Sequence, residues 1–97
     1  MATLIKATGE TSVVEPKNGR SFTLEELQAL VGGYIEVIHT PAGRILVLNE
    51  EGKLQTPPLP ENRKATAIAH SSGIMPWDRV VGDVVWLTRA EMGEEDP

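Results

Sequence analysis

Residues 23–48 read TLEELQALVGGYIEVIHTPAGRILVL and predict a capped helix followed by a two-stranded hairpin. Thr23 and Glu26 have the spacing of a capping box, in which the Thr23 hydroxyl accepts from the backbone N–H of Glu26 and the Glu26 carboxylate accepts from that of Thr23. Phe22 stands where it can pack against the first turn as a hydrophobic staple. Gly32 can adopt the left-handed conformation that ends a helix. We therefore expect a helix over about 23–31, with one apolar stripe that comprises Leu24, Leu27, Leu30 and Val31.

After Gly33 the period of the sequence changes to two, which is the period of a strand. Residues 34–39 form the first predicted strand, residues 40–43 have the proline and glycine of a turn, and residues 44–48 form the second strand. Residues 45–48 are apolar on both faces, so we expect an interior strand covered on both sides, with a helix over one of them.

The flanking segments extend this pattern. Residues 3–7 and 10–15 predict an N-terminal hairpin, and residues 83–88 predict a last strand. Residues 53–55 predict a short edge strand, followed by a proline-rich connector. Asn62 can cap a shorter helix over about 62–70. The fold class expected is α+β, a small and mostly antiparallel sheet of about five to six strands with two helices.

Composition limits the class of protein. The 97 residues are enough for one domain with a modest core, for which we expect the bounds 1–89, with an acidic, disordered tail over 90–97. The chain has no cysteine, which excludes disulfides and thiolate nucleophiles and argues against a zinc site. No apolar run approaches the roughly 18–20 residues of a membrane span, and the N-terminus lacks a signal peptide's apolar core. We expect a soluble cytoplasmic protein with no membrane partner.

The formal charge of −5 is concentrated at the C-terminus. Four acidic residues lie in the last seven positions, and residues 1–90 carry ten acidic against nine basic residues, a net charge of −1. A nearly neutral body argues against an acidic mimic of DNA. It also argues against direct nucleic-acid binding, which favours a basic stripe.

No catalytic motif is recognisable. His39 and His70 lack a serine or carboxylate at a motif spacing, and the pair Glu50–Glu51 sits in a predicted turn, where a solvated loop is the simpler interpretation. The phosphate-loop pattern GxxxxGK[ST] is absent, and no set of residues has the spacing of a metal site. We therefore predict a protein that is not an enzyme and has no cofactor and no metal.

Binding residues are easier to nominate. Trp77 lies in a loop bounded by glycine and proline, where a large ring is either a lid over the core or an exposed contact. Tyr34 begins a strand directly after two glycines, so its hydroxyl can reach the edge of a pocket. Further polar contacts could come from Arg44, Asn49, Asn62 and Arg63, although each of these is also typical of a structural cap or a solvated side chain.

These segments together resemble the DUF3846 family. The residues that carry the resemblance are LVGGYIEV at 30–37, NEEGK at 49–53, the Asn62–Arg63 link and DRVVGDVVWL at 78–87. The similarity covers residues 12–88, and residues 66–77 are less typical of the pattern. The resemblance implies a compact α+β domain of unknown function from a phage, plasmid or other mobile element. It supplies no catalytic residues to transfer.

Two functions follow as hypotheses. The first is a non-enzymatic accessory protein of a phage or mobile element that binds a small ligand stoichiometrically, such as a nucleotide, as a counter-defence protein. The second is an interaction module that inhibits or modulates a host protein through an exposed strand edge or the Trp77 loop. We also expect a homo-oligomer, a dimer, because the apolar strand at residues 84–87 has little predicted helix to cover it.

Overall fold

The computed structural model describes residues 1–73 and 78–93 and consists of five strands, two α-helices and a short 3-10 turn. This arrangement confirms the predicted α+β class and every predicted element except one. The elements are β1 (Ala2–Ile5), β2 (Thr11–Val14), α1 (Leu24–Val31), β3 (Ile35–Thr40), the 3-10 turn (Pro41–Gly43), β4 (Arg44–Asn49), α2 (Arg63–His70) and β5 (Val84–Thr88).

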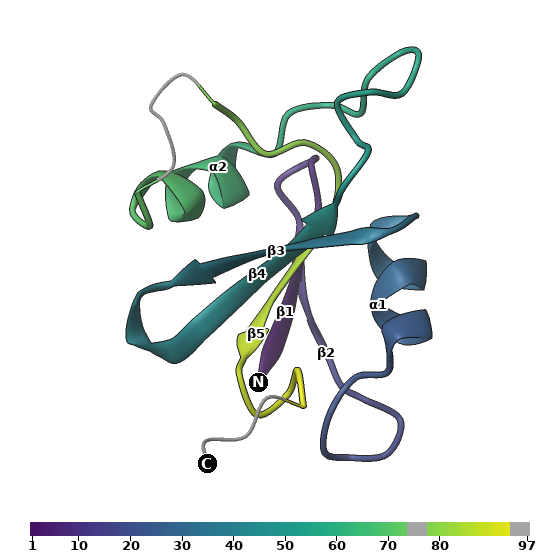
Figure 1. The fold of residues 1–97 in the computed structure, drawn as a ribbon, viewed down its shortest axis with the longest axis vertical. Coiled ribbons are helices and arrows are strands. Elements are labelled where there is room, and N and C mark those ends of the chain that lie inside the picture. Colours follow the sequence, from purple (N-terminus) through teal and green to yellow (C-terminus); the bar gives the residue numbers. More distant parts are fainter. Residues whose placement is uncertain (74–77, 94–97) are drawn as a thin grey trace.

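The strands form one antiparallel sheet in the order β2-β1-β5-β4-β3. The two hairpins β1–β2 and β3–β4 form its two halves, and the last strand of the chain, β5, lies between them (Figure 1). In the centre of the sheet Val85 of β5 is level with Leu4 of β1 and with Val47 of β4. The centre of the sheet therefore joins strands that are far apart in the sequence. The strands β2 and β3 are its two edges.

The two helices cover opposite faces of the sheet (Figure 1). Leu27 and Val31 of α1 pack with Val47 and Val85, whereas Ala65 and Ala69 of α2 pack on the other face. Side chains of successive strand residues point to opposite faces, so β4 and β5 contribute to both cores. This is why residues 45–48 are apolar without alternation, as the sequence predicted.

Both helix starts have the caps that the sequence predicts. The Thr23 hydroxyl accepts from Glu26 N–H at 3.2 Å, and the Glu26 carboxylate accepts from Thr23 N–H at 2.9 Å. Gly32 ends α1 with a φ of 84°. The Asn62 side chain caps α2 by accepting from Ala65 N–H at 3.0 Å. Within the predicted stripe of α1, however, Leu24 is 52% exposed, and the buried residues of the helix are Leu27 and Val31.

Residues 53–55 do not form the predicted edge strand. They lie in a series of turns, with Leu54 N–H donating to the Glu51 carbonyl at 3.0 Å and the Leu54 side chain 80% exposed. The local turn satisfies these backbone groups, and the prolines that follow cannot donate to a ladder. The sheet therefore ends at β3 on this side.

The apolar strand β5 is covered within a single chain. Val84, Val85 and Leu87 are each 0% exposed, since one helix lies over each face. The reason given for expecting a dimer, an uncovered strand, is therefore wrong, although the dimer itself stays a prediction.

The C-terminal segment continues past β5 as a turn. The Glu91 carbonyl accepts from Phe22 N–H at 2.8 Å, and Met92 packs against the α1 side of the core. Residues 94–97, the most acidic part of the predicted tail, lie outside the described residues. Neither helix in the described ranges is long and apolar enough to cross a membrane.

Candidate functional site

A cavity of about 600 Å³ lies between α1, the end of β2 and the loop that joins them. The apolar side chains of Val14, Phe22, Ala29 and Leu30 line it. Within the sheet, α1 packs mainly against β4 and β5, and the cavity lies on the side of the helix that faces the end of β2. Val14 is accordingly only half-buried, and Ala29 is exposed.

The loop that forms one wall of this cavity is attached to α1 through Glu26. One carboxylate oxygen of Glu26 closes the capping box, and the other accepts from Lys17 N–H at 3.0 Å. The backbone N–H groups of Thr23 and Lys17 stabilise the ionised form and lower the pKa of Glu26 below its usual value of 4.5. One side chain therefore fixes both the helix start and the position of the loop.

Phe22, which lines the cavity, is fixed by a hydrogen bond to the turn that follows β5. Phe22 is buried, and its N–H donates to the Glu91 carbonyl. The Glu91 carboxylate in turn accepts from the N–H and the hydroxyl of Thr88, at 2.9 and 3.0 Å. The turn after β5 thus fixes Phe22, the residue before the N-cap of α1.

A second cavity, of about 380 Å³, lies at the C-terminal half of α1 and is lined by Ala7, Leu59, Pro60 and Asp83 among others. It shares Ala29 and Leu30 with the first cavity, so the two follow one another along the helix. We call these two cavities together the α1 groove.

The C-terminal end of β2 borders the α1 groove through Val14. β2 reads Thr-Ser-Val-Val, and Val13 is 56% exposed. No further strand of the described chain pairs with this edge. The opposite edge, β3, carries Glu36 and His39, and charged side chains on an edge are a known protection against unwanted strand pairing. β2 has no such charge within the strand.

Of the six residues predicted to bind a ligand, the five within the described ranges do not lie together in one cavity. Tyr34 is 66% exposed and borders a cavity of about 270 Å³, together with Asn49. Arg63 is exposed at the start of α2. Trp77 lies outside the described residues. Arg44 lies at the far end of the β3–β4 hairpin, with its guanidinium 4.8 Å from the centre of the Trp86 ring.

The two asparagines have structural roles instead. Asn49 is buried, donates to the Val31 carbonyl at 3.3 Å and accepts from Glu51 N–H at 2.9 Å. Gly33 allows this packing, because a Cβ there would lie 2.9 Å from the Asn49 amide nitrogen. Asn62 is 1% exposed and donates to the carbonyls of Ile5 and Gly82, at 2.8 and 2.9 Å. Both side chains are therefore buried and engaged by backbone groups, although Asn49 also borders the cavity beside Tyr34.

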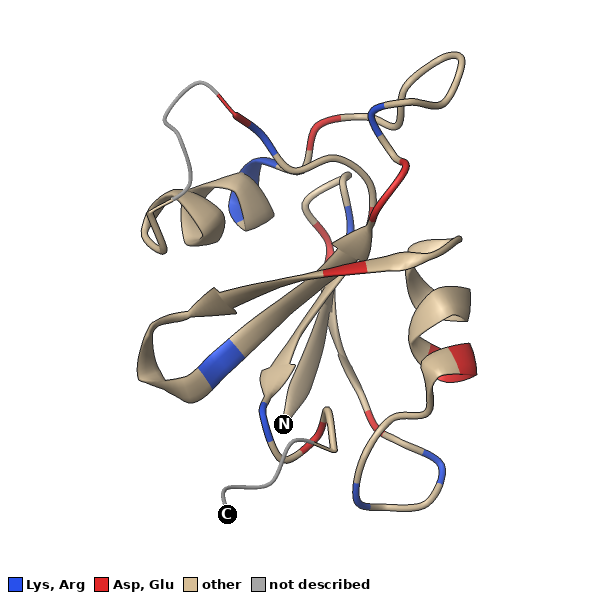
Figure 2. Ribbon diagram, in the orientation of Figure 1, with Lys and Arg blue, Asp and Glu red and all other residues tan. Residues whose placement is uncertain are grey.

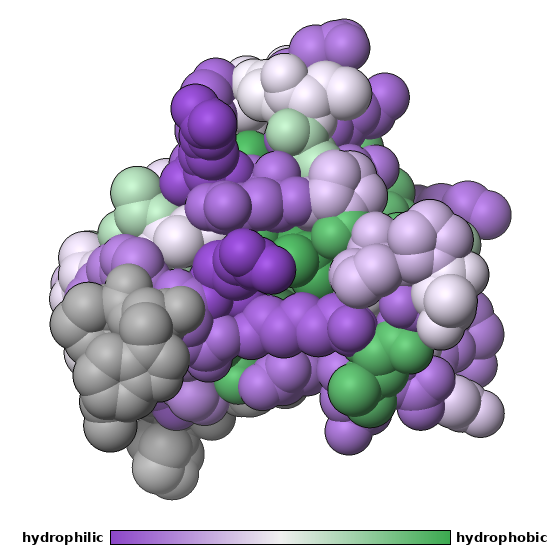
Figure 3. All heavy atoms as spheres, turned by 90° about the horizontal axis from the view of Figure 1, so that it is seen from above, coloured by the Kyte–Doolittle hydropathy of each residue, from purple (hydrophilic) through white to green (hydrophobic). Residues whose placement is uncertain are grey.

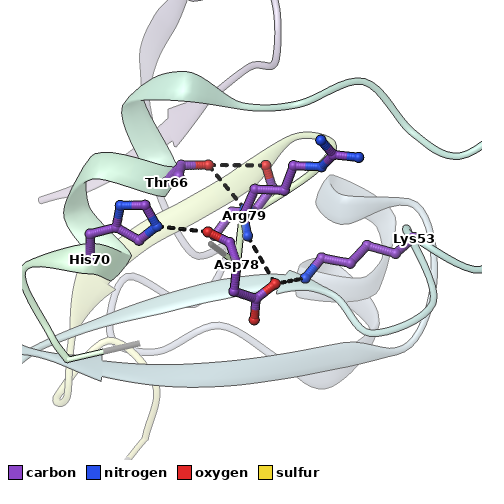
Figure 4. A network of polar contacts seen from close by, with 6 residues as sticks. Lys53, Thr66, His70, Asp78 and Arg79 are labelled. Carbon is purple, nitrogen blue, oxygen red and sulfur yellow. Dashed lines mark hydrogen bonds and ion pairs between the residues drawn. The ribbon is translucent and has the colours of Figure 1, made fainter. Parts of the chain in front are cut away.

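A polar network near α2 is also structural (Figure 4). His70 Nε2 donates to the Asp78 carbonyl at 2.6 Å, and the Thr66 hydroxyl accepts from Val80 N–H at 2.9 Å. The Asp78 carboxylate pairs with Lys53, and this contact lowers the pKa of Asp78. These contacts attach residues 78–80 to α2 and to the 50–60 loop. Over residues 1–73 and 78–93, no group of three histidine or acidic side chains is placed to hold a metal ion.

The face that carries α2 and the 50–60 loop has no large apolar patch among the residues that the structure describes (Figure 3). Seen from above, the face that carries α2 and the 50–60 loop is mostly hydrophilic, and its hydrophobic residues form separate small areas outside the part drawn in grey (Figure 3). The α1 groove could not be predicted from the sequence, because it depends on where α1 crosses the sheet. The available signals were the uncharged strand at residues 11–14 and the small Ala29 next to Leu30 of the apolar stripe.

The family model described as Domain of unknown function (DUF3846) matches residues 1–96, and the chain therefore belongs to this family. No match was found among curated proteins or among solved structures.

Proposed function

We propose that this member of the DUF3846 family is a protein-interaction module that binds one extended segment of a partner protein. The segment adds as a strand beside β2 and places its side chains in the α1 groove. The observation that carries the proposal is a cavity with apolar side chains in its wall, Val14 and Phe22 among them, at the end of an edge strand whose four residues carry no charge. An edge strand offers unpaired backbone groups, and pockets beside it select side chains, which is the usual basis of recognition by strand addition.

The geometry of β2 supports this mode of binding. Val14 is level with Ala2 of β1 and shares the sheet face covered by α1, so side chains of an added strand on that face would enter the groove. On the opposite face, an apolar side chain of the added strand would cover the exposed Val13. We therefore expect a partner segment with apolar residues on both faces.

The two parts of the site also match in length. The four residues of β2 span about 13 Å, at about 3.3 Å per residue. The eight residues of α1 span about 12 Å, at 1.5 Å per residue. A segment of roughly four to five residues would therefore pair with the whole of β2, and its side chains nearest Val14 would reach the groove.

The alternative of a small ligand has less support. A nucleotide would need cations for its phosphates, and Lys17 is the single cationic residue among those that line the α1 groove in the described chain. Lys and Arg residues are dispersed over the structure, which favours a protein partner over a nucleic acid (Figure 2). Nucleotide binding, a counter-defence role and a phage or mobile-element origin all stay predictions, as does the absence of enzymatic activity.

A yeast-displayed library of random twelve-residue peptides tests the proposal, with the purified protein as bait. The variant Ala29→Arg places a long charged side chain in the wall shared by both cavities, at an exposed helical position that tolerates arginine. Ala67→Arg is the matched control, since Ala67 is equally exposed in the middle of α2 on the other face.

We expect peptides that are enriched by the wild type and by Ala67→Arg, and that bind Ala29→Arg at least tenfold more weakly. Peptides that bind all three proteins equally would place the site elsewhere. The absence of any enriched peptide would contradict strand addition as the function.

A further inference from the structure

We infer that the segment bound in the α1 groove carries Lys or Arg on both sides of its apolar residues, and that it comes from a different protein rather than from a second copy of this chain. This inference names the partner chemistry and rests on the function proposed above. It is carried by the distribution of charge around the groove and around both ends of β2.

The residues that line the α1 groove carry a net negative charge. Four carboxylates line it (Glu15, Glu25, Glu26 and Asp83), against the single ammonium of Lys17. This gives a net charge of −3 at the groove, whereas residues 1–90 as a whole carry −1. The other residues within 1–90 therefore carry a small positive net charge. The net negative charge of this part of the chain comes from the residues that line the groove.

Two of the four carboxylates are available to a partner. Glu26 is engaged by the N–H groups of Thr23 and Lys17, and Asp83 accepts from Ala7 N–H at 3.0 Å. Glu15 and Glu25 are exposed, and neither forms an ion pair with a cation of residues 1–73 or 78–93. They lie at the end of the groove where β2 stops and α1 begins, so a cation that follows the apolar residues of an added strand would reach them.

The other end of β2 is acidic too. Glu10 immediately precedes the strand and Glu15 immediately follows it. If two copies paired antiparallel through β2, Glu10 of one copy would stand opposite Glu15 of the other at both ends. Like charges placed directly opposite across a strand pair are destabilising. A segment with basic residues on both sides of its apolar core turns the same two positions into favourable pairs.

Selection from the peptide library described above tests this inference through the composition of the enriched peptides. We expect Lys and Arg to exceed Asp and Glu at the positions that flank the apolar core. The double variant Glu15→Gln/Glu25→Gln should bind the most enriched peptide about tenfold more weakly at 50 mM salt, with the loss falling to about twofold at 500 mM because exposed charges are screened.

The matched control is Glu36→Gln/Glu50→Gln, which removes two exposed carboxylates outside the groove and changes the net charge by the same amount. We expect it to bind the peptide as the wild type does. Equal losses in both double variants would show a general charge effect and overturn the inference.

Two further outcomes separate this inference from the proposed function. Enriched peptides that lose binding in Ala29→Arg but show no excess of basic residues would overturn the basic-partner inference while the strand-addition function stands. A dimer in sedimentation velocity that Ala29→Arg dissociates would assign the groove to a second copy and overturn the inference. If the library yields no peptide at all, the function and the inference fail together.

Discussion

Replacement of Asn62 by alanine should destabilise the fold strongly, because it removes three buried polar contacts at once. The Asn62 side chain caps α2 and donates to two buried carbonyls, those of Ile5 and Gly82. Loss of the cap costs about 1 kcal/mol. Each carbonyl that loses its donor in a buried position costs about 1–1.5 kcal/mol more. The total is about 3–4 kcal/mol, a large fraction of the roughly 5–15 kcal/mol expected for a domain of this size.

Equilibrium unfolding in urea, followed by far-ultraviolet circular dichroism, measures this loss. With a slope of about 1.5 kcal/mol per M, the midpoint should fall by about 2 M. Asn18→Ala is the control, because Asn18 accepts from Arg20 and Ser21 N–H on the exposed 15–22 loop, and its replacement should cost less than about 1 kcal/mol.

Asn62→Asp distinguishes the contribution of the helix cap from that of the hydrogen bonds to the two buried carbonyls. Aspartate is as good a helix cap as asparagine, but it cannot donate to the two carbonyls and brings a carboxylate against them. We expect it to be at least as unstable as Asn62→Ala near neutral pH. An Asn62→Asp protein as stable as the wild type would show that the cap alone matters and would refute the role assigned to the carbonyl contacts.

Two further predictions concern the surface. Arg44→Ala should lower the free energy of unfolding by about 0.5–1 kcal/mol through loss of the contact with the Trp86 ring, measured by urea unfolding with tryptophan fluorescence; an equal change in Arg63→Ala, at an exposed position on α2, would contradict a specific ring contact. The two backbone N–H groups that donate to Glu26 hold its pKa below 4.5, so its contribution to stability is fully present above about pH 4.5 and is lost as the pH falls through the lowered pKa. Glu26→Gln should therefore differ most from the wild type at pH 6 and converge with it towards pH 3 in urea midpoints, whereas a constant difference would rule out this linkage.

Much of the local structure could be predicted because its signals are short in range. The Thr23–Glu26 capping box, Gly32 at the end of α1 and the Asn62 cap each depend on residues within a few positions, and all three are confirmed. The same holds for the β3–β4 turn, although Ala42 there has a φ of 64°, a conformation that the sequence does not lead us to expect outside glycine.

The roles of the two asparagines could not be predicted, because they depend on contacts between distant segments. Asn62 donates to Ile5, 57 positions away, and Asn49 donates to Val31, 18 positions away. A polar side chain in a loop of the sequence is compatible with ligand binding until its surroundings are known. In the folded protein, buried backbone carbonyls use the donors that the sequence pattern had assigned to a ligand.

The α1 groove depends on long-range packing in the same way. Sequence analysis predicted the apolar stripe of α1 but not which strands it covers. Because the helix lies over β4 and β5, Ala29 and Leu30 face an open surface beside β2 instead of a fully packed core. The exposure of Leu24 was likewise not predicted from the spacing of the apolar residues.

Hydrogen–deuterium exchange of the backbone amides tests strand addition at β2 most directly. The wild-type protein would be compared with and without the most enriched library peptide at a concentration that saturates the wild type, with Ala29→Arg as the weakly binding control. Strand addition predicts that amides of Thr11–Val14 on the outer side of β2 exchange at least tenfold more slowly with peptide, while those of the opposite edge, Ile35–Thr40, do not change. A peptide that binds the wild type but leaves the exchange of β2 unchanged, or slows β3 instead, would contradict the account.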